Sequence, residues 1–309
     1  MAHFAGPTPI GVPPKIMDPN TVDPTKLFGV KGMVVVITGG GTGIGLMMTK
    51  AFANNGAAKA YIVGRRKEKL EEAAREASPH GNVIPIVGDA TSKDSLRRVA
   101  EQIKNETGYV NLVCANSGWY SPPISAEPNE ATLEEYADAC MEQNMEDWNT
   151  GFATNTTAVA FTTFAFLKLL DAGNKAQNFA GIKSQVLVTT SIAGYLRNPL
   201  GFSAYPMTKA ATTHLVKSLS GALVPYSIRV NGIAPGLFPG DLSAGITRSK
   251  GDPCVEGAFE KGFIPAERLG ATSDMAGTVL YMASPAGAYL NGCVNVVDGG
   301  RIGQIAGTY

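Results

Sequence analysis

The sequence lacks an excess of charge of either sign. Its 309 residues include 26 lysines and arginines and 26 aspartates and glutamates, so the formal net charge is zero. No overall electrostatic field therefore attracts nucleic acid or an anionic membrane surface. We expect neither of these to be a partner of the protein.

Cysteine and histidine are scarce. Four cysteines are scattered without a Cys-x-x-Cys pair, and the three histidines show no ligand spacing. This pattern argues against a disulfide framework and against a metal site, and it predicts reduced thiols. No apolar run is long enough to span a bilayer, and the first residues show no secretory signal. The simplest interpretation is a cytoplasmic protein.

Glycine, by contrast, is concentrated in Thr38 to Gly45, where five of eight residues are glycine. The apolar run 33–37 before this stretch is typical of a buried parallel strand, and residues 46–53 after it have helix-forming composition. This context predicts a dinucleotide-binding loop, because glycine lets a pyrophosphate approach the backbone and the helix offers free N–H groups. An ordinary strand-to-helix turn is the alternative.

From residue 32 onward, short apolar strands alternate with helices. We expect strands at 33–37, 60–64, 83–87, 110–115, 186–190, 227–233 and 294–297. Helices are expected at 46–53, 66–77, 92–106 with Ser92 as the N-cap, 145–170, 204–223 and 273–283. Repeated β-α units predict an α/β fold, with a single Rossmann-like, doubly wound parallel sheet and helices on both faces.

Three segments depart from this alternation. Residues 1–30 are rich in proline and predict an extended N-terminal arm, which leaves 31–309 as a single catalytic domain. Residues 119–144 and 237–270 lack strand character and follow the carboxyl ends of strands. Because open α/β sheets bind ligands there, we expect two structureless substrate-side loops or a lid. Ordinary surface loops are the alternative.

The residues after the second expected strand bear on cofactor choice. The strand ends in Gly64-Arg65-Arg66-Lys67, with three cations and no acid. An NAD site places an acid near this point, whereas arginine accommodates the 2′-phosphate of NADP. Guanidinium groups grip phosphate through charge-assisted hydrogen bonds, so NADP(H) is favoured. The alternative is that these cations only form the solvent-exposed start of a helix.

Tyr205 and Lys209 are four residues apart at the start of an expected helix and therefore share one face. An ammonium group one turn away would stabilise the tyrosinate and lower its pKa, which suits acid–base chemistry. Ser191 follows the fifth expected strand and could offer a hydroxyl to a substrate oxygen. A Tyr–Lys pair alone is weak evidence, because such pairs are common on helices.

Together these motifs resemble the classical short-chain dehydrogenase/reductase family. The resemblance rests on Thr38 to Gly45, Ser191 and Tyr205-x-x-x-Lys209, in the family's order and spacing. Further matches are Asp89, Asn116-Ser117-Gly118, Asn155, residues 229–236 and residues 297–300. Within the family the chain is most similar to fungal members that are 3-oxoacyl-[acyl-carrier-protein] reductase-like.

The resemblance implies roles for individual residues. Tyr205 would be the general acid, Lys209 would lower the Tyr205 pKa and hold the nicotinamide ribose, and Ser191 would polarise the carbonyl. Asn155 would hold a water behind Lys209, Asp89 would contact the adenine, and Asn116 would stabilise the sheet. The implied cofactor-binding residues are Thr38, Gly39, Gly41, Thr42, Gly43, Ile44, Gly45, Arg65, Arg66, Asp89, Ala90, Asn116, Gly118, Tyr205, Lys209, Pro235, Gly236 and Phe238.

Two positions depart from the family's pattern. Its usual Asn-Asn-Ala-Gly is Ala115-Asn116-Ser117-Gly118 here, and the threonine that often follows Pro235-Gly236 is replaced by Leu237. Neither change removes a catalytic group. The resemblance therefore still implies an active enzyme.

The expected function is NADPH-dependent reduction of a small or medium hydrophobic ketone to a secondary alcohol, or the reverse. Loop aromatics could form apolar walls for it, namely Trp119, Trp148, Phe202, Phe238 and Phe263, with Leu237. An isomerase or cyclase on the same scaffold is one alternative. A nucleotide-binding regulator without turnover is another. The family implies a homotetramer or homodimer, and Phe161, Phe164, Ala165 and Lys168 could form its interface or pack on the sheet.

Overall fold

The computed structural model describes residues 21–78, 80–179, 181–197, 202–240 and 251–308. Within these ranges seven strands form one parallel sheet in the order β3-β2-β1-β4-β5-β6-β7, which confirms the predicted doubly wound sheet. Each predicted strand lies within two residues of its observed bounds. The strands are β1 (Val34–Thr38), β2 (Lys59–Gly64), β3 (Val83–Val87), β4 (Leu112–Ala115), β5 (Gln185–Thr189), β6 (Arg229–Pro235) and β7 (Val294–Val297).

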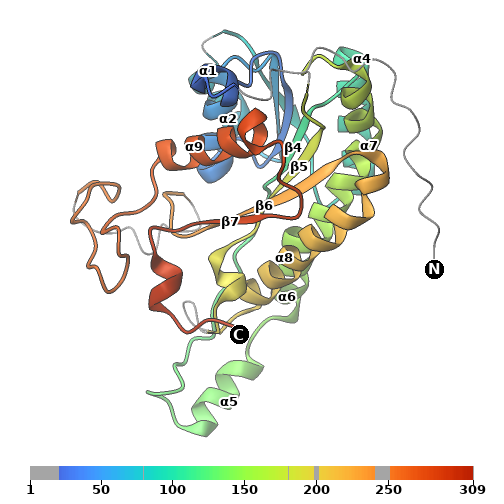
Figure 1. The fold of residues 1–309 in the computed structure, drawn as a ribbon. Helices are drawn as coiled ribbons and strands as arrows, with labels where there is room; N and C mark the ends of the chain where they lie inside the picture. The colour runs from blue at the N-terminus through green and yellow to red at the C-terminus, as the bar shows by residue number, and fades with distance from the viewer. Residues whose placement is uncertain (1–20, 79, 180, 198–201, 241–250, 309) are drawn as a thin grey trace, which may run out of the picture.

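Helices cover both faces of the sheet (Figure 1). One face carries α2 (Gly43–Asn54), α3 (Lys67–Ala77) and α9 (Thr272–Ala283). The other carries α4 (Lys93–Thr107), α7 (Ala158–Ala176) and α8 (Ala204–Ala222). Ser92 caps α4 as predicted, because its hydroxyl oxygen accepts a hydrogen bond from the Ser95 amide.

Burial on both faces explains the unbroken apolar runs in the strands. In β1, Val34 and Val36 join the core that contains Phe166 of α7. Val35 and Ile37 alternate with them and join the core that contains Phe52 of α2. Because successive side chains of a strand point to opposite faces, a strand buried on both sides must be apolar throughout.

The sheet topology creates a crevice beside β1. This strand pairs with β2 on one side and β4 on the other, with Val36 opposite both Tyr61 and Val113. The chain moves outward from β1 to β3 and then returns to β4, so the segments that follow β1 and β4 diverge. In such sheets ligands bind at this point, outside the carboxyl ends of the strands.

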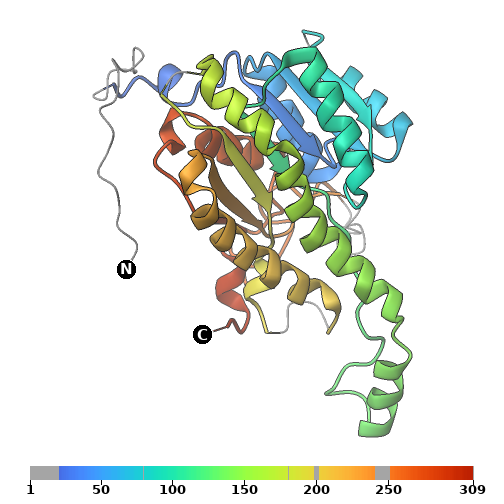
Figure 2. The same cartoon turned by 90° about the vertical axis from the view of Figure 1, so that its right-hand side faces the viewer.

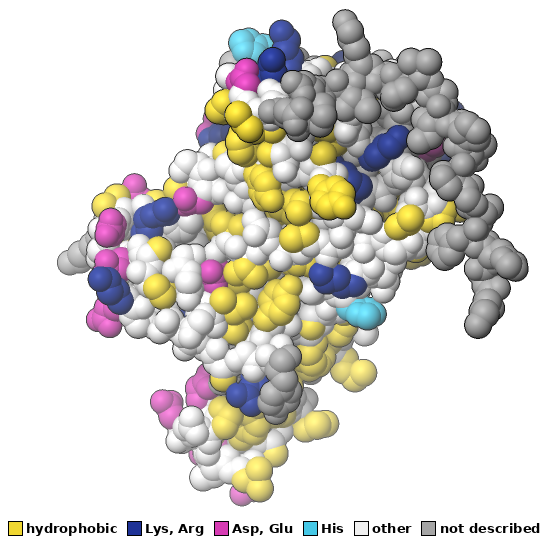
Figure 3. All heavy atoms as spheres, viewed as in Figure 1, with side chains coloured by type: hydrophobic (Ala, Val, Ile, Leu, Met, Phe, Trp, Pro, Cys, Tyr) yellow, Lys and Arg dark blue, Asp and Glu magenta, His cyan; other side chains and the backbone are white. Residues whose placement is uncertain are grey.

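The predicted structureless segment 119–144 contains a helix, so that prediction was wrong. Helix α5 (Leu133–Met141) begins with a capping box, in which the Thr132 hydroxyl and the Glu135 carboxylate each accept from the other residue's amide. The Thr-x-x-Glu pattern was the available signal. The helix projects from the body of the fold (Figure 2), and hydrophobic and acidic side chains lie together on it (Figure 3).

The predicted helix 145–170 is present but interrupted. It comprises α6 (Met145–Phe152), a π-helical turn (Ala153–Thr157) and α7, which runs on to Ala176. A π-turn inserts an extra residue, and such turns occur frequently at functional sites. This one contains Asn155.

The predicted N-terminal arm is partly described. Residues 1–20 lie outside the described ranges, while Pro24–Leu27 form a short helix, α1, capped by Asp23. Val30 is buried in the core beside Met33, so the end of this segment packs on the domain rather than extending from it. In the described ranges, no helix is long and apolar enough to cross a membrane, and no His, Cys, Asp and Glu cluster could hold a metal.

Candidate active site

A cavity of about 1100 Å³ opens at the carboxyl ends of the strands. Segments that follow each strand contribute to its lining, from Gly39 after β1 to Arg301 after β7. The cavity brings together all the predicted site residues except Thr38 and Asn155. Those that line it are Gly39, Gly41, Thr42, Gly43, Ile44, Gly45, Arg65, Arg66, Asp89, Ala90, Asn116, Gly118, Ser191, Tyr205, Lys209, Pro235, Gly236 and Phe238.

The glycine loop leaves the first turn of α2 open to the cavity. Thr42 is the N-cap of α2, yet its side chain makes no capping hydrogen bond. The first amides of a helix have no partner within it, so Gly43, Ile44 and Gly45 can present theirs to a ligand. A side chain at Gly45 would come within 2.6 Å of Asn116 Nδ2. Glycine is therefore required there for space, and the open amides fit a dinucleotide phosphate.

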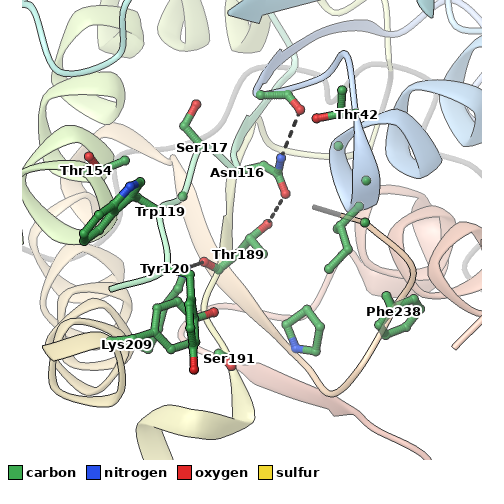
Figure 4. Close-up of a pocket in the computed structure, with 18 of the residues that line it drawn as sticks. Thr42, Asn116, Ser117, Trp119, Tyr120, Thr154, Thr189, Ser191, Lys209 and Phe238 are labelled. Atoms are coloured by element: carbon green, nitrogen blue, oxygen red, sulfur yellow. Dashed lines mark hydrogen bonds between the residues drawn. The ribbon is translucent and has the colours of Figure 1, made fainter. Parts of the chain in front are cut away.

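Thr38 and Asn116 fasten the strands beneath this loop. The buried Thr38 hydroxyl accepts from the amides of Asn116 (3.0 Å) and Ser117 (3.2 Å), so Thr38 ties β1 to the end of β4 rather than lining the cavity. Asn116 Nδ2 donates to Thr38 O at 3.1 Å, and its Oδ1 accepts from Thr189 Oγ1 at 2.9 Å (Figure 4). One amide side chain thus joins β1, β4 and β5.

A basic rim borders the cavity where β2 and β3 end. Arg65, Arg66 and Lys69 are exposed and line it, and Asp89 lies opposite them after β3. Burial alone would raise the pKa of Asp89, but hydrogen bonds from Thr91 and the charge of Arg65 hold it below its ordinary value. Asp89 therefore stays ionised, and the rim keeps a positive excess that fits a phosphate group.

Ser191, Tyr205 and Lys209 converge from two segments. Ser191 follows β5, while Tyr205 and Lys209 occupy the first two turns of α8. Lys209 Nζ donates to Thr189 O at 2.9 Å and lies 5.8 Å from the centre of the Tyr205 ring. Ser191 lies close enough to Tyr205 to lower the Tyr205 pKa in part. Figure 4 shows Ser191, Lys209 and Tyr120 on one side of the cavity, with Thr42 and Phe238 on the other.

The predicted lowering of the Tyr205 pKa by Lys209 is wrong for this structure. Burial raises the pKa of Tyr205 to about 12, the nearby Ser191 side chain offsets this in part, and the neighbouring Tyr120 adds to it. Burial also lowers the pKa of Lys209 to about 8. Desolvation disfavours the charged form of either group, and for Tyr205 it outweighs the opposing effect of Ser191. Tyr205 is therefore a protonated acid at neutral pH.

Asn155 lies behind the cavity wall. Its side chain is fully buried, with Nδ2 donating to Trp119 O (2.8 Å) and Thr208 Oγ1 (2.9 Å). Its Oδ1 accepts from the Trp119 amide at 2.8 Å. Both donors are thus used to hold the start of the segment 119–124 against α8. The structure assigns Asn155 a positioning contact there, whereas a water-holding role remains a prediction.

The predicted aromatic walls are only partly present. Trp119, Leu237 and Phe238 line the cavity, whereas Trp148 and Phe202 contact each other outside its lining and Phe263 packs beneath Arg301. The second predicted substrate loop, 237–270, contributes residues 237–240 to the lining, and its residues 241–250 lie outside the described ranges.

Sequence reasoning missed several lining residues. Tyr120 packs on Tyr205 with ring centres 5.1 Å apart, Thr150 and Thr154 enter from the broken helix, and Arg301 enters after β7. Tyr120 lies two residues after the matched Asn116-Ser117-Gly118, so the sequence could have indicated that it reaches the site. The others depend on the π-turn and on the path of the C-terminal segment, which no local pattern shows.

The chain matches known proteins over most of its length. Residues 33–251 match the family model described as short chain dehydrogenase. The chain is 44% identical over 284 residues to the short-chain dehydrogenase/reductase PhomF of Diaporthe leptostromiformis, covering 92% of this chain and 96% of that protein. It is 40% identical over 313 residues to the short-chain dehydrogenase/reductase VdtF of Byssochlamys spectabilis, covering 95% and 100%.

A solved structure agrees with this likeness. The Pseudomonas aeruginosa RhlG/NADP active-site complex superposes with a TM-score of 0.75 at 27% identity, covering 90% of this chain and 99% of that chain.

Proposed function

This chain belongs to the short-chain dehydrogenase family, and from that premise we propose that it reduces a ketone to a secondary alcohol with NADPH, or catalyses the reverse oxidation. Membership and the reductases among its relatives make it a carbonyl or alcohol oxidoreductase. The observation that carries the finer proposal is the meeting of Ser191, Tyr205 and Lys209 in one cavity with the glycine loop.

In this proposal NADPH, when bound, supplies the hydride. The amides of Gly43 to Gly45 hold the pyrophosphate, and Lys209 holds the nicotinamide ribose. Ser191 donates a hydrogen bond that orients and polarises the substrate carbonyl. Tyr205 then gives its proton to the carbonyl oxygen as negative charge develops there. The pKa of Tyr205 is raised above its ordinary value, so the side chain is protonated at neutral pH and can donate a proton in the reduction.

The basic rim supports NADPH over NADH. Arg65, Arg66 and Lys69 lie where the 2′-phosphate would emerge, and no acid follows β2 to bind a free ribose hydroxyl. The RhlG structure contains NADP, which is consistent with this choice.

We also propose a cellular compartment and an oligomeric state for the enzyme. Its four cysteines are free thiols, which suits a reducing compartment such as the cytoplasm. Phe164 on α7 is 47% exposed and touches Phe161 edge-on, so this face suits contact with another copy in a homodimer or homotetramer. Sedimentation equilibrium of the full chain tests the assembly, and a monomer at micromolar concentration would refute it.

The decisive experiment compares Tyr205→Phe with Tyr195→Phe. Tyr195 is also half-buried but does not line the cavity. A panel of hydrophobic ketones is screened by loss of NADPH absorbance, and NADPH binding is followed by tryptophan quenching. Tyr205→Phe should lower kcat by about 10²- to 10⁴-fold with little change in NADPH affinity, because only the proton donor is removed. Tyr195→Phe should retain activity.

Two outcomes would refute this proposal. Undiminished turnover by Tyr205→Phe would remove Tyr205 from the chemistry. Tight NADPH binding with no ketone reduced and no alcohol oxidised would favour the isomerase, cyclase or regulator interpretations instead.

A further inference from the structure

Buried cations at the cavity point to the chemistry of the substrate. Three charged side chains of the described residues are buried, namely Lys209, Arg229 and Arg301. Lys209 and Arg301 line the cavity, whereas Arg229 does not. The mechanism above uses Lys209 and leaves Arg301, which is only 5% exposed, without a role.

The two buried arginines differ in how many hydrogen bonds their guanidinium groups make to the protein. Arg229 donates to Gln185 Oε1 (2.9 Å) and to the carbonyls of Gly287 (3.0 Å), Leu290 (3.1 Å) and Lys183 (3.3 Å). A guanidinium group carries five N–H donors. Arg301 makes one such hydrogen bond within the described ranges, from Nη1 to Phe263 O at 2.7 Å. Its Cζ lies 3.9 Å from the centre of the Phe263 ring, which holds the guanidinium group in place, and among the described residues most of its donors have no partner.

Arg301 also lacks a carboxylate partner among the described residues. Burial lowers the pKa of Arg301, and the charge of Asp298 opposes this only in part. The two Asp298 oxygens accept from the amides of Gly300 (2.9 Å) and Ile302 (2.6 Å) instead. Taking a cation out of water is costly unless it is paired. An anion entering the cavity would therefore gain from a desolvated, pre-oriented guanidinium.

The position of Arg301 directs it toward the substrate rather than the glycine loop. It begins a short 3-10 helix (Arg301–Gln304), whose Ile302 packs with Ile192 and Leu196 beside the turn that follows Ser191. The strand-like pairing of Leu196 with Gly307 holds this turn in place. The basic rim of Arg65, Arg66 and Lys69 belongs to other segments, those that follow β2.

We propose that Arg301 binds a carboxylate of the substrate, so that the enzyme acts on a ketone that also carries a carboxylic acid. The identity of the reacting ketone rests on the proposed function, whereas the anion site does not. Arginine suits this role because its fork matches a carboxylate through two parallel hydrogen bonds. A phosphate of the cofactor is the other source of an anion, and the experiment separates the two.

The test uses phenyl ketones with a carboxylate at the end of a two-, four- or six-carbon chain, each paired with its methyl ester. Binding to the full-length protein saturated with NADP⁺ is measured by equilibrium dialysis, and turnover with NADPH is measured in parallel. The wild type should bind at least one acid roughly 10- to 100-fold more tightly than its ester, as expected for a charge-assisted pair. Arg301→Gln should abolish this preference without changing ester or NADPH affinity.

Two further variants separate binding from structure. Arg301→Lys keeps the charge without the fork and should retain part of the preference. Arg229→Gln removes a buried arginine outside the cavity and should leave the preference intact, even if the protein is less stable. If Arg301→Gln fails to fold, the partial loss in Arg301→Lys decides the question.

The inference is overturned if no acid is preferred by the wild type, or if Arg301→Gln keeps the preference. It is also overturned if NADPH affinity falls in step with acid affinity, because the guanidinium then serves the cofactor. Ketone reduction without acid preference would leave the proposed function standing. An Arg301-dependent acid preference in a protein that turns over no ketone would support the anion site and refute the proposed function.

Discussion

Gly45 allows a direct test of why the glycine loop contains glycine. It has no left-handed backbone angle, so its backbone would accept alanine. A Cβ there, however, would lie 2.6 Å from Asn116 Nδ2 and 2.7 Å from the carbonyl carbon of Gly39. Real Cβ contacts stay above 3.0 Å, so Gly45→Ala must push α2 away from β1 and β4. The matched control is Gly277→Ala in α9, where a Cβ would meet nothing within 4 Å.

The two substitutions should have opposite signs. Gly277→Ala should stabilise the protein by about 0.5–1 kcal/mol, because alanine restricts the unfolded chain and favours helix. Gly45→Ala receives the same benefit but adds roughly 1–3 kcal/mol of overpacking. It also weakens the Asn116–Thr38 hydrogen bond, which contributes about 1 kcal/mol. We expect a net loss of about 1–3 kcal/mol for Gly45→Ala.

Urea unfolding followed by circular dichroism measures the stability change, and a tryptophan-quenching titration measures NADPH affinity. Gly45→Ala should also weaken NADPH binding by about tenfold or more, because the unpaired amides in the first turn of α2 move with the helix. Gly277→Ala should bind NADPH like the wild type. If Gly45→Ala matched the wild type in both stability and affinity, the close-approach argument for this loop would be refuted.

Two other predictions follow from the charges of the site. Arg65→Ala should weaken NADPH binding by roughly 10- to 100-fold and NADH binding little, because only NADPH carries the 2′-phosphate. Lys67→Ala is the control, because Lys67 does not line the cavity. Equal losses of affinity for both cofactors would contradict the phosphate site. Because the pKa of Lys209 is lowered from 10.5 to about 8, its ammonium is charged below that pH and neutral above it, while Tyr205, with a pKa raised to about 12, keeps its proton. The kcat/KM for NADPH should therefore fall as pH rises through about 8. In Lys209→Arg this fall should occur at higher pH. A kcat/KM that stays constant from about pH 6 to about pH 10 would show that Lys209 is not the titrating group.

Most of the fold was predictable because its signals are local. The inner strands β1, β4, β5 and β6 are buried throughout, so they read as short apolar runs. The bounds of all the predicted strands could be placed within two residues. The helix over Leu133–Met141 was missed although Thr132 and Glu135 form a recognisable capping box. Its exposed Leu133 and Met141 have no helical stripe facing a core, which removed the periodic signal that identified the other helices.

The candidate site also contains some features that the sequence predicts and others that it does not. The glycine loop and the Tyr205–Lys209 pair could be recognised because short spacings along the chain position them, and the sheet topology then brings them together. The pKa of Tyr205 could not be predicted with the correct sign, because it depends on burial and on Tyr120, which packs against it from another segment. Arg301 could not be recognised at all, since it reaches the cavity only through the path of the chain after β7.

By itself the sequence determined the α/β class, the doubly wound parallel sheet implied by repeated β-α units, and the residue types available for dinucleotide and carbonyl chemistry. These follow from periodicity and spacing, which act over one or two turns of chain. Only the tertiary structure decided which groups are desolvated, which donors remain unsatisfied and which cations share a cavity. Those properties arise from contacts between distant segments, as where Phe263 orients the buried guanidinium of Arg301, and such contacts determine the electrostatics of the site.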